Sequence, residues 1–187
     1  VAEESADRWS FDLVVGNPPY RRLTEEERRH WSRCGYRSAE SGDMFALFLE
    51  VMQALLRRPG QAGALVVPMS VAFSRGMSSV RRVLLEPDEQ SVSFAHFDNI
   101  PDALFPAGKP ENTNTNKANS QRATVVTVLR RPGPRSVRSS GLLRWRASQR
   151  SQIWSQIRLA EVTGLASAVE GVPKPGSGSE VRFLKVA

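Results

Sequence analysis

The chain has 187 residues, 40% of them apolar, which is enough for one domain and the beginning of a second. Its net charge of +7 comes almost entirely from arginine, because lysine occurs only at positions 109, 117, 174 and 185. Arginine suits phosphate contacts, but a bias towards arginine codons explains the excess equally well, so charge alone argues weakly for nucleic acid. The apolar runs are too short for a membrane span, and no signal peptide precedes the first strand.

Cysteine and histidine usage excludes several kinds of site. Cys34 is the single cysteine, which rules out a disulfide within the chain and a thiol metal site and indicates a reduced cytosolic protein. His30 and His96 show no metal-ligand pattern, so we expect no metal. The chain begins at Val1 without an initiator methionine, and we expect it to be part of a longer protein.

Apolar runs and periodicity predict an alternating α/β order. The predicted strands, of which the first two are buried, span residues 11–15, 64–68, 92–97 and 123–130. The predicted helices run from a capping box at Thr24 to about Trp31, from Asp43 to about Arg58, and from about Gly76 to Glu86. Residues 32–42 are expected to form a loop.

The C-terminal part is predicted to leave this pattern. Pro132-Gly133-Pro134 begins a stretch rich in serine and arginine, which we interpret as a linker over residues 132–141. An apolar pattern resumes in residues 142–187, and Ile153 to Leu159 can form one face of a helix. The roughly 45 residues that remain are too few for a stable independent domain.

The tetrapeptide Asn17-Pro18-Pro19-Tyr20 directly follows the apolar run at 11–16. The Asn17 side-chain oxygen and the Pro18 carbonyl can accept the two hydrogens of an exocyclic amine, which favours a pyramidal nitrogen able to attack a methyl group. Pro19 restricts the backbone of Pro18 and so fixes the direction of its carbonyl. Tyr20 offers a flat face for a base removed from its helix. The alternative is a strand followed by a proline-rich turn with a surface tyrosine.

The tetrapeptide and its strand resemble the catalytic motif of amino-group methyltransferases, and within that group the Eco57I-like DNA adenine-N6 methyltransferases of restriction-modification and phage-defence systems. Three further segments follow in that family's order, over roughly residues 8 to 131. They are Asp43-Met44-Phe45-Ala46-Leu47-Phe48-Leu49-Glu50, Ala64-Leu65-Val66-Val67-Pro68, and Phe97-Asp98-Asn99-Ile100-Pro101-Asp102-Ala103-Leu104-Phe105-Pro106.

The resemblance implies the C-terminal half of a Rossmann-like, S-adenosylmethionine-dependent methyltransferase sheet with an antiparallel edge pair. Residues 1–131 are then the C-terminal half of the catalytic domain, and residues 142–187 begin a truncated target-recognition region. Only ten residues precede the motif strand, and no glycine-rich strand-to-helix turn occurs. We therefore expect an incomplete cofactor site and an inactive isolated chain. The expected partners are double-stranded DNA and the rest of a bacterial, cytoplasmic parent polypeptide, with its N-terminal cofactor half and C-terminal recognition domain.

Residue roles follow from the same resemblance. Asn17 and Pro18 would bind the target amine, Pro19 would border the methyl donor, and Tyr20 and Phe105 would stack on the two faces of the flipped base. Phe48, expected on the inner face of its helix, would pack against the cofactor's adenine, with plain core packing as the alternative. Lys117 and Arg122, in or beside an asparagine-rich loop, can hold phosphate, although the loop can equally be a solvated insertion.

Asp98 and Asp102 are expected to cap turns. Two other functions stay open: an amino-group methyltransferase acting on RNA or protein glutamine, and a non-catalytic DNA-binding remnant that lacks the cofactor half.

Overall fold

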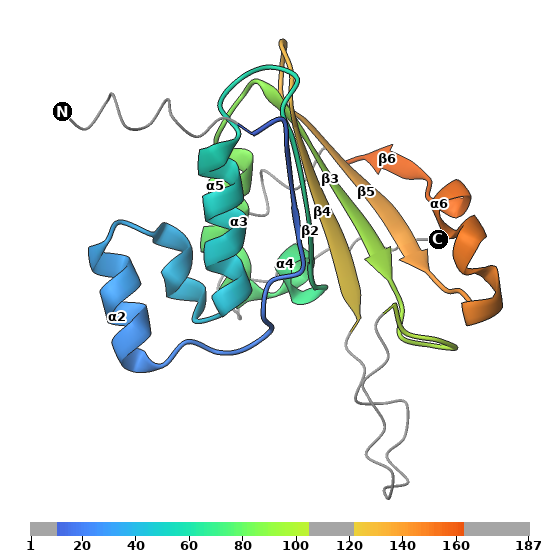
Figure 1. The fold of residues 1–187 in the computed structure, drawn as a ribbon, viewed down its shortest axis with the longest axis horizontal. Coiled ribbons are helices and arrows are strands. Elements are labelled where there is room, and N and C mark those ends of the chain that lie inside the picture. The colour runs from blue at the N-terminus through green and yellow to red at the C-terminus, as the bar shows by residue number, and fades with distance from the viewer. Residues whose placement is uncertain (1–10, 105–121, 163–187) are drawn as a thin grey trace, which may run out of the picture.

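The computed structural model describes residues 11–104 and 122–162, which form one six-stranded sheet with helices on its faces (Figure 1). In chain order the strands are β1 (Leu13–Gly16), β2 (Ala62–Pro68), β3 (Gln90–Phe97), β4 (Ala123–Arg130), β5 (Ser136–Leu143) and β6 (Leu159–Glu161). The α-helices are α2 (Glu25–Arg33), α3 (Met44–Leu55), α4 (Ser70–Phe73), α5 (Ser78–Leu85) and α6 (Ile153–Gln156). Short 3-10 helices occur at η1 (Arg37–Ser41), η2 (Arg75–Met77) and η4 (Ala147–Gln152).

The strand order is β1-β2-β4-β3-β5-β6. Strands β1, β2, β3 and β5 run in the same direction, and β4 runs the opposite way between β2 and β3. The predicted antiparallel pair of the third and fourth strands is thus present. It lies inside the sheet rather than at its edge, because β5 and β6 extend the sheet beyond β3.

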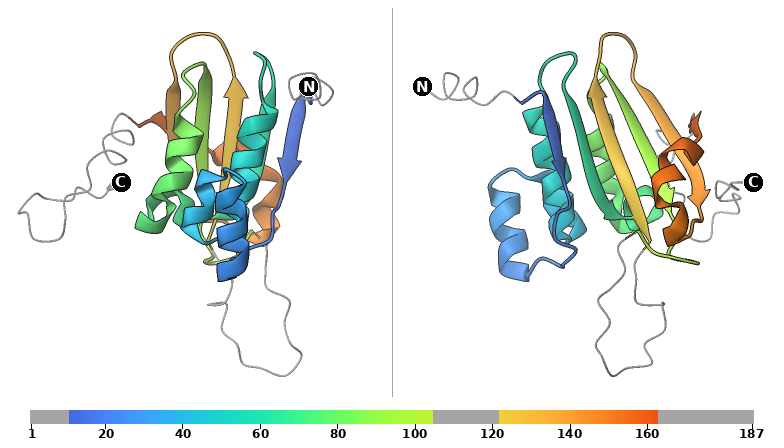
Figure 2. Two further views of the ribbon diagram at one scale, coloured as in Figure 1. Left: turned by 90° about the vertical axis from the view of Figure 1, so that its left-hand side faces the viewer. Right: turned by 45° about the vertical axis from the view of Figure 1, so that its right-hand side comes forward.

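The main core lies between one face of the sheet and the helix pair α3 and α5, which stand side by side on that face (Figure 2). The register aligns Leu65, Val126 and Phe94 across β2, β4 and β3, so that their side chains form one buried row. Helix α3 contributes Phe45 and other apolar side chains that cover this row. A smaller cluster on the opposite face packs Ala95 and Phe97 against Trp145 and Ile153.

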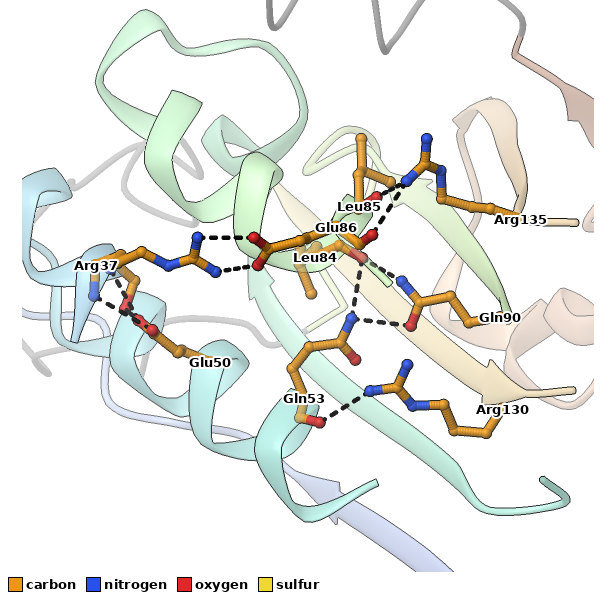
Figure 3. A network of polar contacts seen from close by, with 10 residues as sticks. Arg37, Glu50, Gln53, Leu84, Leu85, Glu86, Gln90, Arg130 and Arg135 are labelled. Atoms are coloured by element: carbon orange, nitrogen blue, oxygen red, sulfur yellow. Dashed lines mark hydrogen bonds and ion pairs between the residues drawn. The ribbon is translucent and has the colours of Figure 1, made fainter. Parts of the chain in front are cut away.

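Polar side chains connect α3 and α5 to the beginning of β3 and the end of β4 (Figure 3). Gln53 of α3 donates to the Gln90 side chain at 2.9 Å, and both amides donate to the Leu84 carbonyl near the end of α5. Arg130 of β4 donates to the carbonyls of Gln53 and Leu56. These contacts satisfy carbonyls at helix ends that otherwise lack partners.

Helix α2 stands outside the helix layer, away from the sheet (Figure 1). The predicted capping box is confirmed: Thr24 accepts from the backbone N–H of Glu27, and the Glu27 carboxylate accepts from the N–H of Thr24. None of its residues is buried. The helix is therefore stabilised mainly by its capping box and by ion pairs along its surface, and less by core packing.

Strand β1 is parallel to β2, as expected, but it is not buried. Val14 faces the core, whereas Leu13 and Val15 are 60% and 66% exposed. The reason is that β1 is an edge strand, and the described residues cover β1 only on the face that carries α3. The apolar composition of β1 thus predicts more burial than these residues receive.

The predicted linker at 132–141 is wrong in its second half, because residues 136–143 form β5. Serine is an unusual strand former, but here its hydroxyls bond to the neighbouring strand. Ser136 donates to the Ser91 hydroxyl at 3.0 Å, and Ser140 accepts from the His96 N–H at 2.9 Å. The expected helix at 153–159 is only α6, followed by β6.

Helix boundaries differ from the expectation at several points. Helix α3 ends at Leu55 because the Gln61 side chain accepts from the N–H groups of Arg57 and Arg58, which turns the chain towards β2. The predicted 32–42 loop contains η1, and the predicted 76–86 helix is shorter and is preceded by α4 and η2.

Gly63 of β2 allows α3 to approach the sheet closely. A Cβ at this position would lie 2.6 Å from the Met52 sulfur and 3.0 Å from Leu56 Cδ1. We expect Gly63→Val to lower the free energy of unfolding by about 1–3 kcal/mol through overpacking. Chemical denaturation measures this, with Ala64→Val on the opposite, half-buried face as the control. Equal stability of the two variants would contradict the close packing.

Candidate functional site

The candidate site lies at the edge of the sheet where the parallel strands end. Asn17, Met69, Asp98 and Arg144 follow the ends of β1, β2, β3 and β5, and Arg122 immediately precedes the reversed strand β4. This edge is the lower one in Figure 1. Ligands of open α/β sheets bind outside the carboxyl ends of the strands, so these residues stand where a substrate site is expected.

The Asn17-Pro18-Pro19-Tyr20 loop follows β1 at this edge, and the Asn17 side chain is exposed. Asn17 and Pro19 are exposed, Pro18 is buried and Tyr20 is half-buried. The Asn17 side chain makes no hydrogen bond to another described residue. Its amide oxygen is therefore available to an incoming donor.

Tyr20 anchors the loop from behind. Its hydroxyl donates to the Val66 carbonyl of β2 at 3.0 Å, and its ring packs edge-on against Phe45 of α3 with centroids 6.4 Å apart. Burial raises the pKa of the Tyr20 phenol to about 12. Tyr20 thus has a structural role in addition to the stacking role expected for it.

Two arginines fix the segment after the loop. Arg21 makes a two-pronged ion pair with Glu27, at 2.8 and 2.6 Å, and the pKa of Glu27 is lowered to about 2 by this pair and by its bond to Thr24. Arg22 pairs with Asp43 at 2.7 Å, so Asp43 precedes α3 without capping it through its side chain. The loop is held between β1 and the start of α3, which restricts its backbone.

Phe48 lies on the exposed side of α3, with 44% of its surface accessible, and not on the inner face as expected. Core packing therefore does not account for this aromatic side chain. Helix α3 begins at the carboxyl edge, which leaves the second turn of the helix, with Phe48, open to a ligand.

Arg122 makes an ion pair that the sequence did not indicate. Its Nε donates to Asp98 Oδ1 at 2.8 Å, and Arg144 Nε donates to Asp98 Oδ2 at 2.9 Å. The Asp98 side chain is 1% exposed, whereas those of Arg122 and Arg144 are 46% and 71% exposed. Asp98 also accepts from the N–H of Asn99, so the turn-capping role expected for it is only part of its function.

The pKa of Asp98 reflects opposing effects. Burial acts to raise the pKa, but the hydrogen bonds from Arg122, Arg144 and the Asn99 N–H outweigh it. The net pKa lies below the ordinary value, and the carboxylate is ionised at neutral pH.

The register explains why these three side chains meet. Phe97 is paired with Ala123 on one side and with Leu143 on the other, so the next residue, Asp98, falls between Arg122 and Arg144. In the sequence, the one sign of this cluster was Asp98, a carboxylate that directly follows a predicted strand. Its partners depend on strand pairing, which the sequence alone does not specify.

His96, near the same edge, is not an open base. Its two ring nitrogens bond to Thr124 Oγ1 at 2.8 Å and Ser139 Oγ at 3.0 Å, and burial lowers its pKa. Across residues 11–104 and 122–162 there is no group of side chains suited to a metal and no helix long and apolar enough to cross a membrane. Phe105 and Lys117 lie outside the described residues.

Solved structures similar to this chain define the class of fold. They include the DrdV–DNA complex (16% identity, TM-score 0.56, 86% of this chain and 18% of that chain). A nuclease-deletion mutant of the type ISP restriction-modification enzyme LlaGI with a DNA substrate mimic matches at 11% identity and TM-score 0.58, over 87% of this chain and 18% of that chain. A modification subunit of a putative type I restriction enzyme from Vibrio vulnificus YJ016 matches at 17% identity and TM-score 0.52, over 85% and 35%. At these identities the similarity concerns the fold, which is the α/β sheet of restriction-modification methyltransferases.

The family is given by the sequence itself. The model described as Eco57I restriction-modification methylase matches residues 3–100, just over half of the chain, and the chain belongs to this family. No curated protein matches it. The chain spans about a fifth to a third of the length of the three structures above.

Asp98→Asn should destabilise the protein at neutral pH, because it removes the negative charge shared by two arginines. We expect a loss of about 1.5–3 kcal/mol, the range for hydrogen bonds to charged groups. Since folding lowers the pKa of Asp98, this stabilisation is complete above about pH 4, the ordinary aspartate value, and is lost as pH falls through the lower folded pKa.

Denaturant unfolding from pH 7 into the acid range measures the difference between wild type and Asp98→Asn. Asp88→Asn is the control, because Asp88 is 86% exposed and pairs with Arg135 at 3.5 Å, an arrangement that contributes little. A loss for Asp98→Asn no larger than for Asp88→Asn would show that the Asp98 ion pairs do not stabilise the fold.

Proposed function

We propose that this chain is part of a site-specific DNA methyltransferase that methylates the exocyclic amine of adenine in duplex DNA after flipping the base out of the helix. The observation that carries the proposal is the exposed Asn17 amide on a fixed loop at the carboxyl edge of the sheet. The family of the chain and the DNA-bound restriction-modification enzymes among its structural neighbours support DNA as the substrate. The RNA and protein-glutamine alternatives gain no such support.

In this proposal the loop acts through acceptors and not through a base. The Asn17 side-chain oxygen and the Pro18 carbonyl accept the two amine hydrogens, so that the nitrogen lone pair becomes localised as the reaction proceeds. The bond from Tyr20 to Val66 and the two arginine ion pairs beyond it limit movement of these acceptors. Preorganised acceptors need no rearrangement when charge develops, which is the source of their catalytic effect.

Tyr20 and Phe105 are proposed to stack on opposite faces of the extruded base. Lys117 and Arg122 are proposed to contact the DNA backbone. Because Tyr20 also packs against Phe45 and bonds to Val66, replacing it changes the packing as well as the stacking. Asn17 is exposed and its side chain bonds to no other described residue, so it is the better position for testing the proposal.

S-adenosylmethionine, when bound, supplies the methyl group. The exposed Pro19 beside the amine site and the exposed Phe48 of α3 suit one apolar wall of such a cofactor pocket. Among the described residues there is no glycine-rich strand-to-helix turn and no assigned carboxylate for the ribose. We propose that these come from the rest of the parent polypeptide, as does the target-recognition domain, because residues 142–162 complete β5, form β6 and pack against the same sheet.

The open face of β1 supports this arrangement. Leu13 and Val15 are more than half exposed, and β1 pairs on one side only within the described chain. Exposed apolar side chains on an unpaired edge strand are costly in water and favour aggregation. A neighbouring strand and a helix from the cofactor half would pair with the free edge of β1 and cover Leu13 and Val15.

Asn17→Ala in the complete natural protein should abolish methylation and leave duplex binding nearly unchanged. Loss of one transition-state acceptor reduces turnover by about 10²–10³, whereas affinity depends mainly on phosphate contacts elsewhere. Methyl transfer to duplex DNA and equilibrium binding are measured in parallel, with the exposed amide Gln149→Ala on η4 as the control. A variant within threefold of wild-type turnover would remove Asn17 from the mechanism.

The isolated 187-residue chain should bind S-adenosylmethionine weakly or not at all, because it supplies one wall of the pocket. Titration calorimetry tests this directly, with the complete protein as the positive control. Micromolar binding by the isolated chain would mean that it holds the whole cofactor site. No binding by the complete protein would favour a non-catalytic DNA-binding protein instead.

A further inference from the structure

The Asp98 ion pairs leave the outer parts of two guanidinium groups unused. Arg122 and Arg144 both bond to Asp98 through Nε, the nitrogen closest to the chain. Their terminal amino groups have no partner among the described residues. The two side chains are 46% and 71% exposed, although the carboxylate that holds them is 1% exposed. The terminal amino groups of the two arginines therefore lie on the solvent side of the buried Asp98 carboxylate.

Charge balance separates this cluster from an ordinary structural ion pair. One arginine is enough to neutralise a buried carboxylate, and the second leaves the cluster with one net positive charge. A guanidinium held at Nε also keeps its planar fork in a fixed orientation, so little conformational entropy is lost when it binds an oxyanion. Phosphate oxygens accept two parallel bonds from such a fork.

The spacing suits a polymer of phosphates. Arg122 and Arg144 lie on strands two steps apart, about 10 Å between backbones, but their side chains converge on Asp98, so the two guanidinium groups are neighbours. Asp98 is three strand steps from Asn17, or about 14 Å. Phosphates recur about every 3.4 Å along the axis for each DNA strand, so the cluster stands about four nucleotides from a base held at Asn17.

We propose that Arg122 and Arg144, oriented together by Asp98, form a clamp for the sugar-phosphate backbone of duplex DNA beside the flipped base. Arg144 and the orienting carboxylate are the new elements. The clamp positions the duplex through phosphate contacts and carries no sequence information. It rests on the proposed function, because it assumes that duplex DNA lies along the carboxyl edge.

Salt dependence of DNA binding tests the clamp without requiring the recognition sequence or methyl transfer. The complete natural protein is titrated with a random-sequence duplex from about 0.05 to 0.5 M salt, without cofactor. Each lost phosphate contact lowers the slope of log K against log salt by about 0.9, which corresponds to about eightfold weaker binding at 0.1 M. We expect this for Arg122→Gln and for Arg144→Gln, and about twice the slope change for the double variant.

Two controls separate phosphate binding from a general loss of charge or stability. Arg131→Gln removes the same charge just beyond the opposite end of β4, where Arg131 bonds only to turn carbonyls, and should keep the wild-type slope. Arg144→Lys keeps the charge but loses the fork, and should keep most of the slope. Thermal unfolding shows that each variant is folded at the temperature of the titration.

The outcomes distinguish this inference from the proposed function. Unchanged slopes for folded Arg122→Gln and Arg144→Gln would overturn the clamp while leaving DNA methylation intact. Equal slope changes for Arg131→Gln and Arg144→Gln would overturn it too, because the effect would then be one of net charge. Absence of duplex binding by the wild-type protein would instead overturn the proposed function.

Discussion

The reversed direction of β4 is the constraint on which the candidate site depends. Because β4 runs against both of its neighbours, β2 and β3, it begins at the edge where β1, β2, β3 and β5 end. That reversal brings Arg122 next to Asp98, whereas a parallel β4 would place its other end, Arg130, there. The strand is held by its buried side chains Val126 and Val128, which are fully covered. The apolar core thus fixes which face of the strand is buried, and the edge is left free to carry charged groups.

Local sequence signals predicted the elements that local interactions determine. The capping box of α2 involves residues three apart and is present in the structure. The strands from β1 to β4 are short apolar runs with clear ends, and each was located correctly to within a few residues. Strand β5 was missed because it pairs with β3, more than forty positions away, where its serine hydroxyls bond to Ser91 and His96. Such pairing leaves no apolar pattern in the sequence.

In the candidate site, too, the parts built from neighbouring residues were predictable and the parts built by strand pairing were not. The Asn17 loop was predictable, because its four residues are contiguous and follow a strand. The Asp98 cluster was not, because it depends on the registers that pair Phe97 with Ala123 and with Leu143. Phe48 was assigned to the wrong face because α3 is apolar around much of its circumference, so its periodicity does not distinguish the core side from the open side. The exposure of Leu13 and Val15 likewise could not follow from an apolar run alone.

The titratable groups near the site bear on the kind of catalysis it can support. His96 is the imidazole near this edge, and both of its nitrogens are occupied by hydroxyls while burial disfavours its charged form. Asp98 is held ionised but is enclosed between two arginines, which makes it a poor proton acceptor. Tyr20 bonds to a backbone carbonyl, and burial raises its pKa to about 12. With these three groups committed to structure, the acceptors that the Asn17 loop offers are neutral: the Asn17 amide oxygen and the Pro18 carbonyl. An amine nucleophile suits such a site, because it can attack first and lose its proton to solvent afterwards.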